Sequence, residues 1–147
     1  HTKLFPMIET TDAYFQATEI AKAHDRVVAM NLGSEDFALS AGMLPEDEGL
    51  FQPTLHVMMA ARAAGVLPLG FIGSIAEYRD RDKFRARIKQ AARLGFLGSA
   101  CIHPLQVDIL NEEFTPPKRP WNNPGVSSRP MTRQRQRGAV PLNMTAK

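Results

Sequence analysis

Four short apolar runs divide the chain, and segments with helical periodicity separate them. The runs have the length of buried β-strands and cover residues 4–8, 27–32, 66–72 and 98–102. Glycines stand where the helices between them would end, at positions 42, 65 and 95. Strands that alternate with helices pair in parallel, because each crossover helix returns the chain to the same end of the sheet. The sequence therefore predicts an α/β fold with a parallel sheet.

Helices are expected from Ala13 to near His24 and Asp25, and at residues 37–41, 79–94 and 105–114; a further helix is expected with Pro53 in its first turn and Gly65 at its end. Thr10, Thr11 and Asp12 can cap the first helix, and a proline costs no hydrogen bond in a first helical turn. The charged residues of 79–94 are expected on the outer face. The residues expected to face the core are Ala13, Ala17, Ile20, Ala21, Leu55, Met58, Met59, Phe84, Ile88, Ala91, Ala92, Leu105, Ile109 and Leu110.

The spacing of the strands points to half of a barrel. Four strands within residues 1–116 is the rate at which a (β/α)₈ barrel, which needs about 250 residues, places strands along its chain. As an open sheet, these strands would leave two unpaired edges, which favours pairing with another copy or with a further part of the barrel.

Two of the strand-like runs lead into carboxylates. Glu9 follows the first run, and Gly33, Ser34, Glu35 and Asp36 follow the second. The carboxyl ends of neighbouring parallel strands lie side by side, so Glu9 and Asp36 can meet although they stand 27 residues apart. Two hard oxygen ligands can hold Mg²⁺ while water and a substrate complete its shell. The spacing leaves a second reading equally open, in which each acid only caps a helix.

The basic charge of the chain lies in its last part. Residues 117–147 hold seven of the 18 Lys and Arg residues and none of the 15 acids, so residues 1–116 carry a net charge of −4 although the whole chain carries +3. This tail is rich in Pro, Ser and Arg and lacks an amphipathic period, which predicts disorder. Nucleic-acid binding by the tail is the weaker hypothesis, because Trp121 alone is available there to stack on a base.

Two single residues invite functional readings that we rank below structural ones. Cys101 has apolar neighbours and is expected to be a buried, inert thiol, and a lone cysteine fits the reducing cytoplasm. His103 precedes Pro104 and is expected to stabilise that turn rather than act as a general base. With no apolar run near 20 residues and no signal-peptide pattern, the expected protein is soluble, cytoplasmic and free of membrane contact.

Four stretches together resemble the HpcH/HpaI aldolase and citrate lyase β-subunit family of CoA-ester lyases over residues 3–116: LFPMIETT, LGSEDF, GFIGSIAEYRDRDKF and LGFLGSACIHPLQVDILNEEFTP. The resemblance implies a TIM barrel of which this chain holds strands five to eight. It also implies Mg²⁺-dependent cleavage of a 3-hydroxyacyl-CoA thioester, such as malyl-, citramalyl- or citryl-CoA, into a keto acid and an acyl-CoA. The family's metal ligands fall on Glu9 and Asp36.

In the same family, the backbone around Gly33, Ser34 and Glu35 binds the carboxylate of the keto acid. Glu35 is expected near the metal without being a ligand, and Asn31, Met30 and residues 72–75 are expected to line the pocket. An arginine that grips the substrate and an acid on a C-terminal lid are expected outside this chain, so its catalytic residues are unknown. Family members form trimers or hexamers, so the expected partner is a further copy or another half-barrel.

The tail departs from the family pattern. Residues 117–137 stand where similar proteins have an Ala/Glu-rich helix, and a neighbouring reading frame of this stretch can encode such a helix. The hypothesis is therefore that the tail is frame-shifted, with the frame restored at Gly138. The alternative function is a non-catalytic remnant of the family, or a subunit that serves in interactions.

Overall fold

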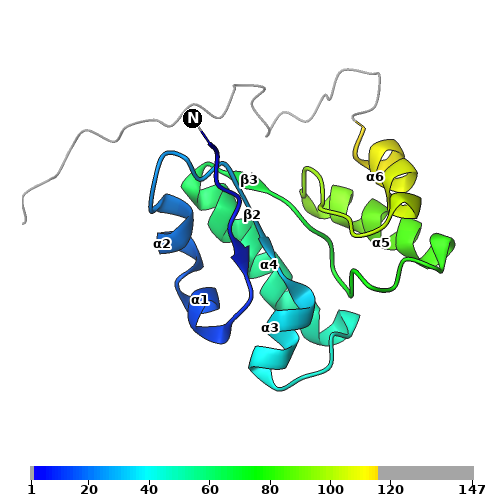
Figure 1. Ribbon diagram of the computed structural model, residues 1–147, viewed down its shortest axis with the longest axis horizontal. Helices are drawn as coiled ribbons and strands as arrows, with labels where there is room; N and C mark the ends of the chain where they lie inside the picture. The colour runs from blue at the N-terminus through cyan, green and yellow to red at the C-terminus, as the bar shows by residue number, and fades with distance from the viewer. Residues whose placement is uncertain (1, 116–147) are drawn as a thin grey trace, which may run out of the picture.

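The computed structural model describes residues 2–115, which are coloured from blue to yellow in Figure 1. Three strands form a parallel sheet in the order β1-β2-β3, with β1 at Met7–Ile8, β2 at Ala29–Leu32 and β3 at Leu67–Pro68. The predicted α/β class with a parallel sheet is confirmed. The predictions for residues 117–147 lie outside the described residues.

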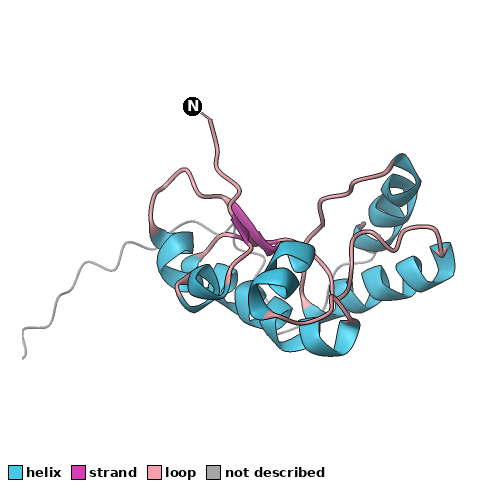
Figure 2. Ribbon diagram, turned by 60° about the horizontal axis from the view of Figure 1, so that its bottom comes forward, coloured by secondary structure: helices cyan, strands magenta, loops and turns pink. Residues whose placement is uncertain are grey.

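Helices dominate the described part of the chain, and the strands beside them are short (Figure 2). The chain leaves α3, α4 and α5 through Gly42, Gly65 and Gly95, which have positive φ angles of 68°, 72° and 105° and end the helices as predicted. Among the described helices, none is both long and apolar enough to cross a bilayer. The helices are α1 (Thr11–Phe15), α2 (Ala17–Lys22), α3 (Ser34–Ala41), α4 (Asp47–Ala64), α5 (Arg81–Leu94), the 3₁₀ turn η1 (Pro104–Gln106) and α6 (Val107–Phe114).

The first predicted helix is two helices, because the chain breaks at Gln16. The Gln16 N–H donates to the carbonyl of Ala13 at 3.2 Å, and its side chain donates to Asp12 Oδ2 at 2.9 Å. Thr10 caps α1 as expected, since its hydroxyl accepts the Ala13 N–H at 3.1 Å. The inward positions of the pattern are confirmed, because Ala17 and Ala21 are fully buried.

Helix α4 begins earlier than predicted, at Asp47, and Pro53 lies inside it. Asp47 and Glu48 occupy the first turn, where negative charge stabilises the positive end of the helix dipole. A proline inside a helix leaves one carbonyl without its usual N–H donor, here that of Gly49, which is exposed and so can reach water. The acidic residues, rather than the proline, therefore mark the start of this helix.

Two clusters of buried side chains hold the fold together, and α4 contributes to both. Leu55 and Met58 pack against the second cluster. Met59 is exposed, so its predicted inward position is wrong; Met58 and Met59 are neighbours and point about 100° apart around the helix. The first cluster holds Ile8, Ala17, Ala21, Val27, Met30, Leu32, Phe37, Leu50, Val57, Ala60, Ala61, Ala64 and Val66. The second holds Phe71, Phe84, Ile88, Ala91, Phe96, Ile109 and Leu110.

The other face of the sheet carries apolar side chains that remain accessible. Met7 lies opposite Asn31 in the register, and Leu67 lies opposite Ala29, so these residues share one face. Met7 is 49% exposed and Leu67 is 43% exposed. Met30 and Leu32 alternate with Asn31 and are buried in the first cluster. One face of the sheet is therefore packed against helices, whereas the other is partly open.

The fourth predicted strand, at residues 98–102, is absent from the sheet. The segment does lie beside β3, since the Leu97 N–H donates to the Pro68 carbonyl at 3.0 Å and the Gly70 N–H donates to the Gly98 carbonyl at 2.9 Å. Beyond this point the N–H groups of Ile102 and His103 donate to Gln106 Oε1, at 2.8 and 3.0 Å. Because these N–H groups donate to the Gln106 side chain, they do not donate to a neighbouring strand, and the pairing with the segment after β3 ends here.

The last predicted helix opens with the 3₁₀ turn η1, and this changes which residue faces inward. Leu105 is exposed and Gln106 is fully buried, contrary to the prediction for Leu105. Gln106 can be buried because its amide oxygen accepts two N–H groups and its nitrogen donates to the Ile75 carbonyl at 3.3 Å. The prediction for Cys101 is also wrong: it is exposed, in the segment that turns away from the sheet.

Candidate functional site

Glu9 follows β1 and lies directly against Gly33, the residue that follows β2. The two segments are joined by a hydrogen bond from the Gly33 N–H to the Ile8 carbonyl at 2.9 Å. A Cβ atom at position 33 would lie 2.5 Å from Glu9 Cγ and 2.9 Å from Oε1. The φ angle of Gly33 is −81°, which any residue can adopt. Glycine is therefore required here to leave room for the side chain of Glu9.

Gly33 is also the N-cap of α3, whose first turn carries Glu35 and Asp36. The first N–H groups of a helix have no acceptor within the helix and point outward at its positive end. Asp36 is exposed, and Ser34 and Glu35 are half-buried. Glu9 is thus brought beside the first turn of α3, where the predicted site residues Gly33, Ser34, Glu35 and Asp36 stand.

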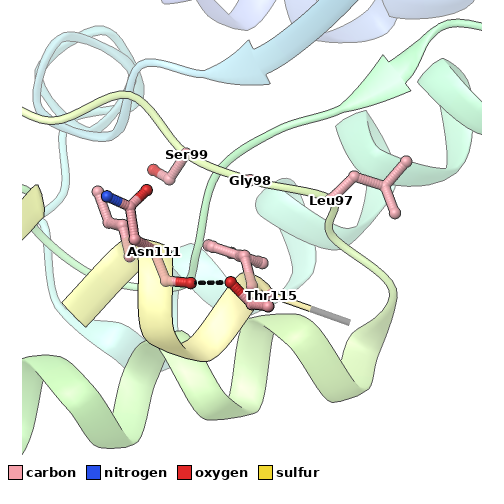
Figure 3. Close-up of a pocket in the computed structure, with 7 residues that line it drawn as sticks. Leu97, Gly98, Ser99, Asn111 and Thr115 are labelled. Atoms are coloured by element: carbon pink, nitrogen blue, oxygen red, sulfur yellow. Dashed lines mark hydrogen bonds between the residues drawn. The ribbon is translucent and has the colours of Figure 1, made fainter. Parts of the chain in front are cut away.

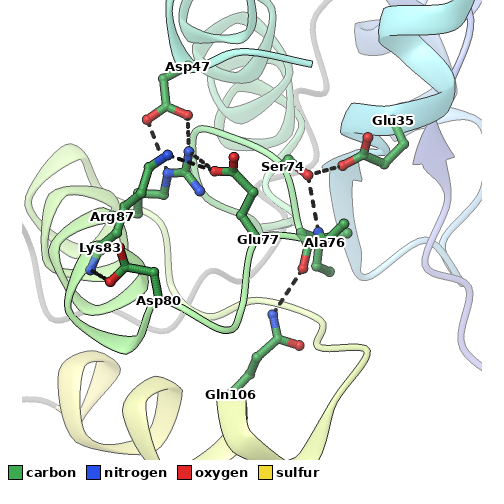
Figure 4. A network of polar contacts seen from close by, with 10 residues as sticks. Glu35, Asp47, Ser74, Ala76, Glu77, Asp80, Lys83, Arg87 and Gln106 are labelled. Atoms are coloured by element: carbon green, nitrogen blue, oxygen red, sulfur yellow. Dashed lines mark hydrogen bonds and ion pairs between the residues drawn. The ribbon is translucent and has the colours of Figure 1, made fainter. Parts of the chain in front are cut away.

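The side chain of Glu35 points toward the loop that follows β3. Its Oε1 atom accepts a hydrogen bond from the hydroxyl of Ser74, as Figure 4 shows. The order of the strands places Glu9 on the β1 side of Gly33 and Ser74 on the β3 side. The carboxylate of Glu35 is therefore engaged by protein, which fits its expected place beside a metal rather than on it.

Asn31 lies on β2, two residues before Gly33, on the partly open face of the sheet. It is 7% exposed, and within the described part of the chain its buried Oδ1 atom accepts no hydrogen bond. A buried amide oxygen without a donor costs free energy. Asn31 therefore carries unused polar capacity on β2, two residues before Gly33.

Sequence reasoning missed Arg87, which was expected on a solvated face of α5. Its side chain is 6% exposed, and it pairs with Asp47 at the start of α4 and with Glu77 in the loop after β3 (Figure 4). Burial lowers the pKa of Arg87, but hydrogen bonds to Asp47 and Glu77 raise it further, and the net shift is upward. Hydrogen bonds from Lys83 and then Arg87 lower the pKa of Glu77 below 4.5. A signal was present: Phe84, Arg87, Ile88 and Ala91 share one helical stripe.

His103 caps the turn that follows it. Its Nδ1 atom accepts the Leu105 N–H at 3.2 Å, and its ring stacks on Tyr78 with the ring centres 4.4 Å apart. These contacts support the structural role predicted for His103.

A cavity of about 320 Å³ lies between the segment after α5 and the end of α6 (Figure 3). None of the predicted site residues lines it, so it is separate from the carboxylates. Its lining residues are Leu97, Gly98, Ser99, Leu110, Asn111, Phe114 and Thr115.

The donor set at Glu9 and Asp36 fits a hard divalent cation. Carboxylate oxygens are preferred ligands of Mg²⁺, which usually takes one or two carboxylates and fills its shell with water and substrate oxygens. Residues 2–115 contain no group of three or more His, Cys, Asp or Glu side chains arranged for a metal. A metal site at these residues would therefore be of the two-carboxylate kind.

Comparison with known proteins decides the family. The model of the HpcH/HpaI aldolase/citrate lyase family matches residues 1–104. The chain belongs to the HpcH/HpaI aldolase/citrate lyase family. It is 34% identical to an L-malyl-CoA/beta-methylmalyl-CoA lyase of Cereibacter sphaeroides, in a match that covers 75% of this chain and 40% of that protein. A (3S)-malyl-CoA thioesterase of the same species is 36% identical, over 77% of this chain and 39% of the relative.

Solved structures of citrate lyase β subunits, which are TIM barrels, share the fold. The citrate lyase beta subunit of M. tuberculosis complexed with oxaloacetate and magnesium superposes with a TM-score of 0.68 at 25% identity, over 78% of this chain and 53% of that one. RipC of Yersinia pestis superposes with a TM-score of 0.71 at 24% identity, over 80% and 54%. The chain thus spans about two fifths of these curated relatives and about half of the solved chains.

Proposed function

We propose that this chain provides the metal-holding part of a Mg²⁺-dependent carbon–carbon lyase that acts on a 3-hydroxyacyl-CoA thioester. The observation that carries the proposal is the approach of Glu9 to Gly33 at the start of α3, where Asp36 stands one turn along. Homology to malyl-CoA lyases supports the substrate class. A relative solved with oxaloacetate and magnesium supports the pairing of a keto acid with this ion.

In the proposed reaction, the bond between the hydroxyl-bearing carbon and the α-carbon of the thioester breaks. Its electron pair passes to the thioester enolate, which takes up a proton to become the acyl-CoA, while the hydroxyl loses its proton and becomes the oxo group of the keto acid. A divalent cation bound at Glu9 and Asp36 would supply positive charge to the carboxylate and oxo oxygens of the keto acid.

The residues of this chain then have separate roles. Glu9 and Asp36 hold the ion between two neighbouring strand ends. The backbone N–H groups at Ser34 and Glu35 bind the keto-acid carboxylate at the positive end of α3, after Gly33 has turned the chain into the helix. Gly33 itself keeps the space that Glu9 occupies. These roles bind and orient the substrate, and the proton-transferring groups are not among them.

The remainder of the site is proposed to lie elsewhere. We assign residues 1–116 to strands five to eight of the barrel, with the substrate-gripping arginine and the lid acid outside this chain. The open apolar face at Met7 and Leu67 would then adjoin the other half of the barrel, supplied by further protein or by a copy in a homo-oligomer. The chain alone is therefore expected to bind the ion but to turn over substrate poorly.

Thioester hydrolysis is a second candidate, because a relative that is 36% identical is a malyl-CoA thioesterase. The two reactions differ in their products. Carbon–carbon cleavage of malyl-CoA yields acetyl-CoA and glyoxylate without a free thiol, whereas hydrolysis yields malate and free CoA. Incubating the chain with malyl-CoA and Mg²⁺, with and without a chelator, and assaying glyoxylate and free thiol separates them.

Glyoxylate that disappears with the chelator and in Glu9→Gln supports the proposed lyase. Free thiol in its place supports the thioesterase. If neither product exceeds the level of Glu9→Gln, Mg²⁺ binding decides: a chain that also binds Mg²⁺ no better than Glu9→Gln is a non-catalytic remnant or an interaction subunit.

A further inference from the structure

The loop after β3 reaches the first turn of α3 through the side chain of Ser74. Its hydroxyl donates to Glu35 Oε1 and accepts the N–H of Ala76 at 3.2 Å (Figure 4). The residue is 6% exposed. Because the hydroxyl oxygen is held by a donor from its own loop, its proton has a fixed direction toward Glu35, and a hydrogen bond to an ionised carboxylate is among the strong ones.

The loop lies against Arg87 on both sides of Ser74. On one side, Gly73 has a φ angle of 115°, and a Cβ atom there would lie 2.5 Å from Asp47 Oδ1 and 2.8 Å from Arg87 Cζ. On the other side, Glu77 pairs with Arg87 at 2.6 Å. The guanidinium is buried and also bonds to Asp47 of α4 through Nε at 3.1 Å. Ser74 therefore projects from a support that α4 and α5 fix.

Glu35 and Asp36 are neighbours in the same turn, so whatever holds Glu35 also fixes the position of Asp36. Ser74 draws Glu35 toward the β3 side, while Glu9 approaches Gly33 from the β1 side. The first turn of α3 is thus held from two opposite directions. If the bond to Ser74 were lost, Glu35 would also be a mobile third carboxylate beside Glu9 and Asp36.

We propose that Ser74 is a positioning residue of the metal site: through Glu35 it fixes the first turn of α3, and with it the place of Asp36 relative to Glu9. This inference rests on the proposed function, since it assumes that Glu9 and Asp36 hold a cation. Ser74 itself touches neither the ion nor the substrate in this account.

The first test is a Mn²⁺ titration of the full chain, followed by electron paramagnetic resonance, with Glu9→Gln as the baseline. Ser74→Ala is expected to raise the Kd about tenfold, the lower end of what removal of an outer hydrogen-bond partner costs a metal site. Ser74→Thr keeps the hydroxyl and is expected to restore binding. Ser99→Ala is the matched control, because within residues 2–115 the Ser99 hydroxyl donates only to the adjacent Ala100 carbonyl; its Kd should stay that of the wild type.

The second test asks whether the effect passes through Glu35. Glu35→Ala should weaken Mn²⁺ binding like Ser74→Ala, and the double variant should be no worse than either single one, because all three lack the same hydrogen bond. Additive losses would overturn the inference, as would a Ser74→Ala protein with wild-type Kd. Equal midpoints of thermal unfolding for the wild type and the variants show that all the proteins compared are folded.

The third test needs no metal. The Phe37 N–H donates to the Gly33 carbonyl at 2.9 Å and closes the first turn of α3. Its hydrogen exchange should become several-fold faster in Ser74→Ala and Glu35→Ala and stay unchanged in Ser99→Ala; unchanged exchange in all variants would overturn the inference. If wild type and Glu9→Gln bind Mn²⁺ equally, the proposed function fails, and the exchange rates still decide whether Ser74 fixes this turn.

Discussion

Two pairs of carboxylates in this fold, Asp47 with Glu77 and Glu9 with Asp36, differ in what balances their charge. Asp47 and Glu77 both contact the buried guanidinium of Arg87, and Glu77 also contacts Lys83 at 2.9 Å. Within residues 2–115, no basic side chain lies within ion-pair distance of Glu9 or Asp36. The first pair is neutralised by protein, whereas the second is not.

This difference separates a structural role from a binding role. The pair at Arg87 joins α4, α5 and the loop after β3, so its carboxylates are used to hold elements together. Glu9 and Asp36 meet the positive end of α3, which partly offsets their charge, and Asp36 is exposed. Carboxylates in such a position keep their capacity for an added cation.

The largest expected effect is the loss of stability when Asp47 and Glu77 lose their shared partner, Arg87. Arg87→Met should lower the free energy of unfolding by about 2–3 kcal/mol, because it leaves two half-exposed carboxylates without their shared partner. Urea unfolding measures this change. Arg85→Met is the control, since Arg85 of α5 bonds Glu112 and Glu113 of α6 and is more exposed than Arg87, 32% against 6%; an equal loss in both variants would contradict a special role for the buried cation.

Gly33→Ala should weaken Mg²⁺ binding by Glu9 and Asp36 more than it lowers the stability of the fold. The new methyl group displaces Glu9, which can swing into solvent, so the expected stability loss is about 1 kcal/mol while Mg²⁺ binding is abolished. Calorimetry of unfolding and of Mg²⁺ binding gives the two values. Gly49→Ala, at an exposed position of α4 where a Cβ atom would meet Met43 at 3.5 Å, should leave binding intact; wild-type binding by Gly33→Ala would refute the steric account.

Asn31→Leu tests the buried polar group on β2, two residues before Gly33. Replacing a buried amide whose oxygen lacks a donor with an apolar side chain of similar size should stabilise the chain by about 1 kcal/mol. The midpoint of urea unfolding reports this gain. Destabilisation would show that Asn31 Oδ1 has a partner in solution, which would change the description of the open face.

The smallest expected effect is the pH dependence of Glu77. Its pKa is lowered in the fold, so its ion pairs stabilise the chain fully above about pH 4.5 and the contribution is lost as the pH falls through the lower, folded value. The difference in unfolding free energy between wild type and Glu77→Gln should therefore shrink below pH 4.5. A difference that stays constant with pH would mean that charge is not the source of the stabilisation by Glu77.

The parts of the fold that depend on local chemistry could be predicted from sequence. Gly42, Gly65 and Gly95 end helices, because glycine readily adopts the positive φ angles required there. The apolar runs that lead into Glu9 and Gly33 contain the paired strands β1 and β2. The parallel sheet follows from these features, whereas the meeting of Glu9 with Asp36 stays a prediction.

The parts of the fold that depend on contacts between residues far apart in the sequence could not be predicted. Arg87 is buried because Asp47 and Glu77 lie 40 and 10 residues away in the chain and still reach it. The pairing of residues 98–102 ends early because Gln106 takes the N–H groups of Ile102 and His103. The bond between Ser74 and Glu35 joins residues 39 positions apart, and no spacing rule in either segment indicates it.

A calorimetric Mg²⁺ titration tests the central claim most directly, with Glu9→Gln and Asp36→Asn as the test variants. Asp108→Asn is the matched control, because Asp108 is also exposed in the first turn of an eight-residue helix, α6. The account predicts that wild type and Asp108→Asn bind Mg²⁺ equally and that both test variants lose binding. Equal binding by all four proteins, or loss in Asp108→Asn alone, would contradict it.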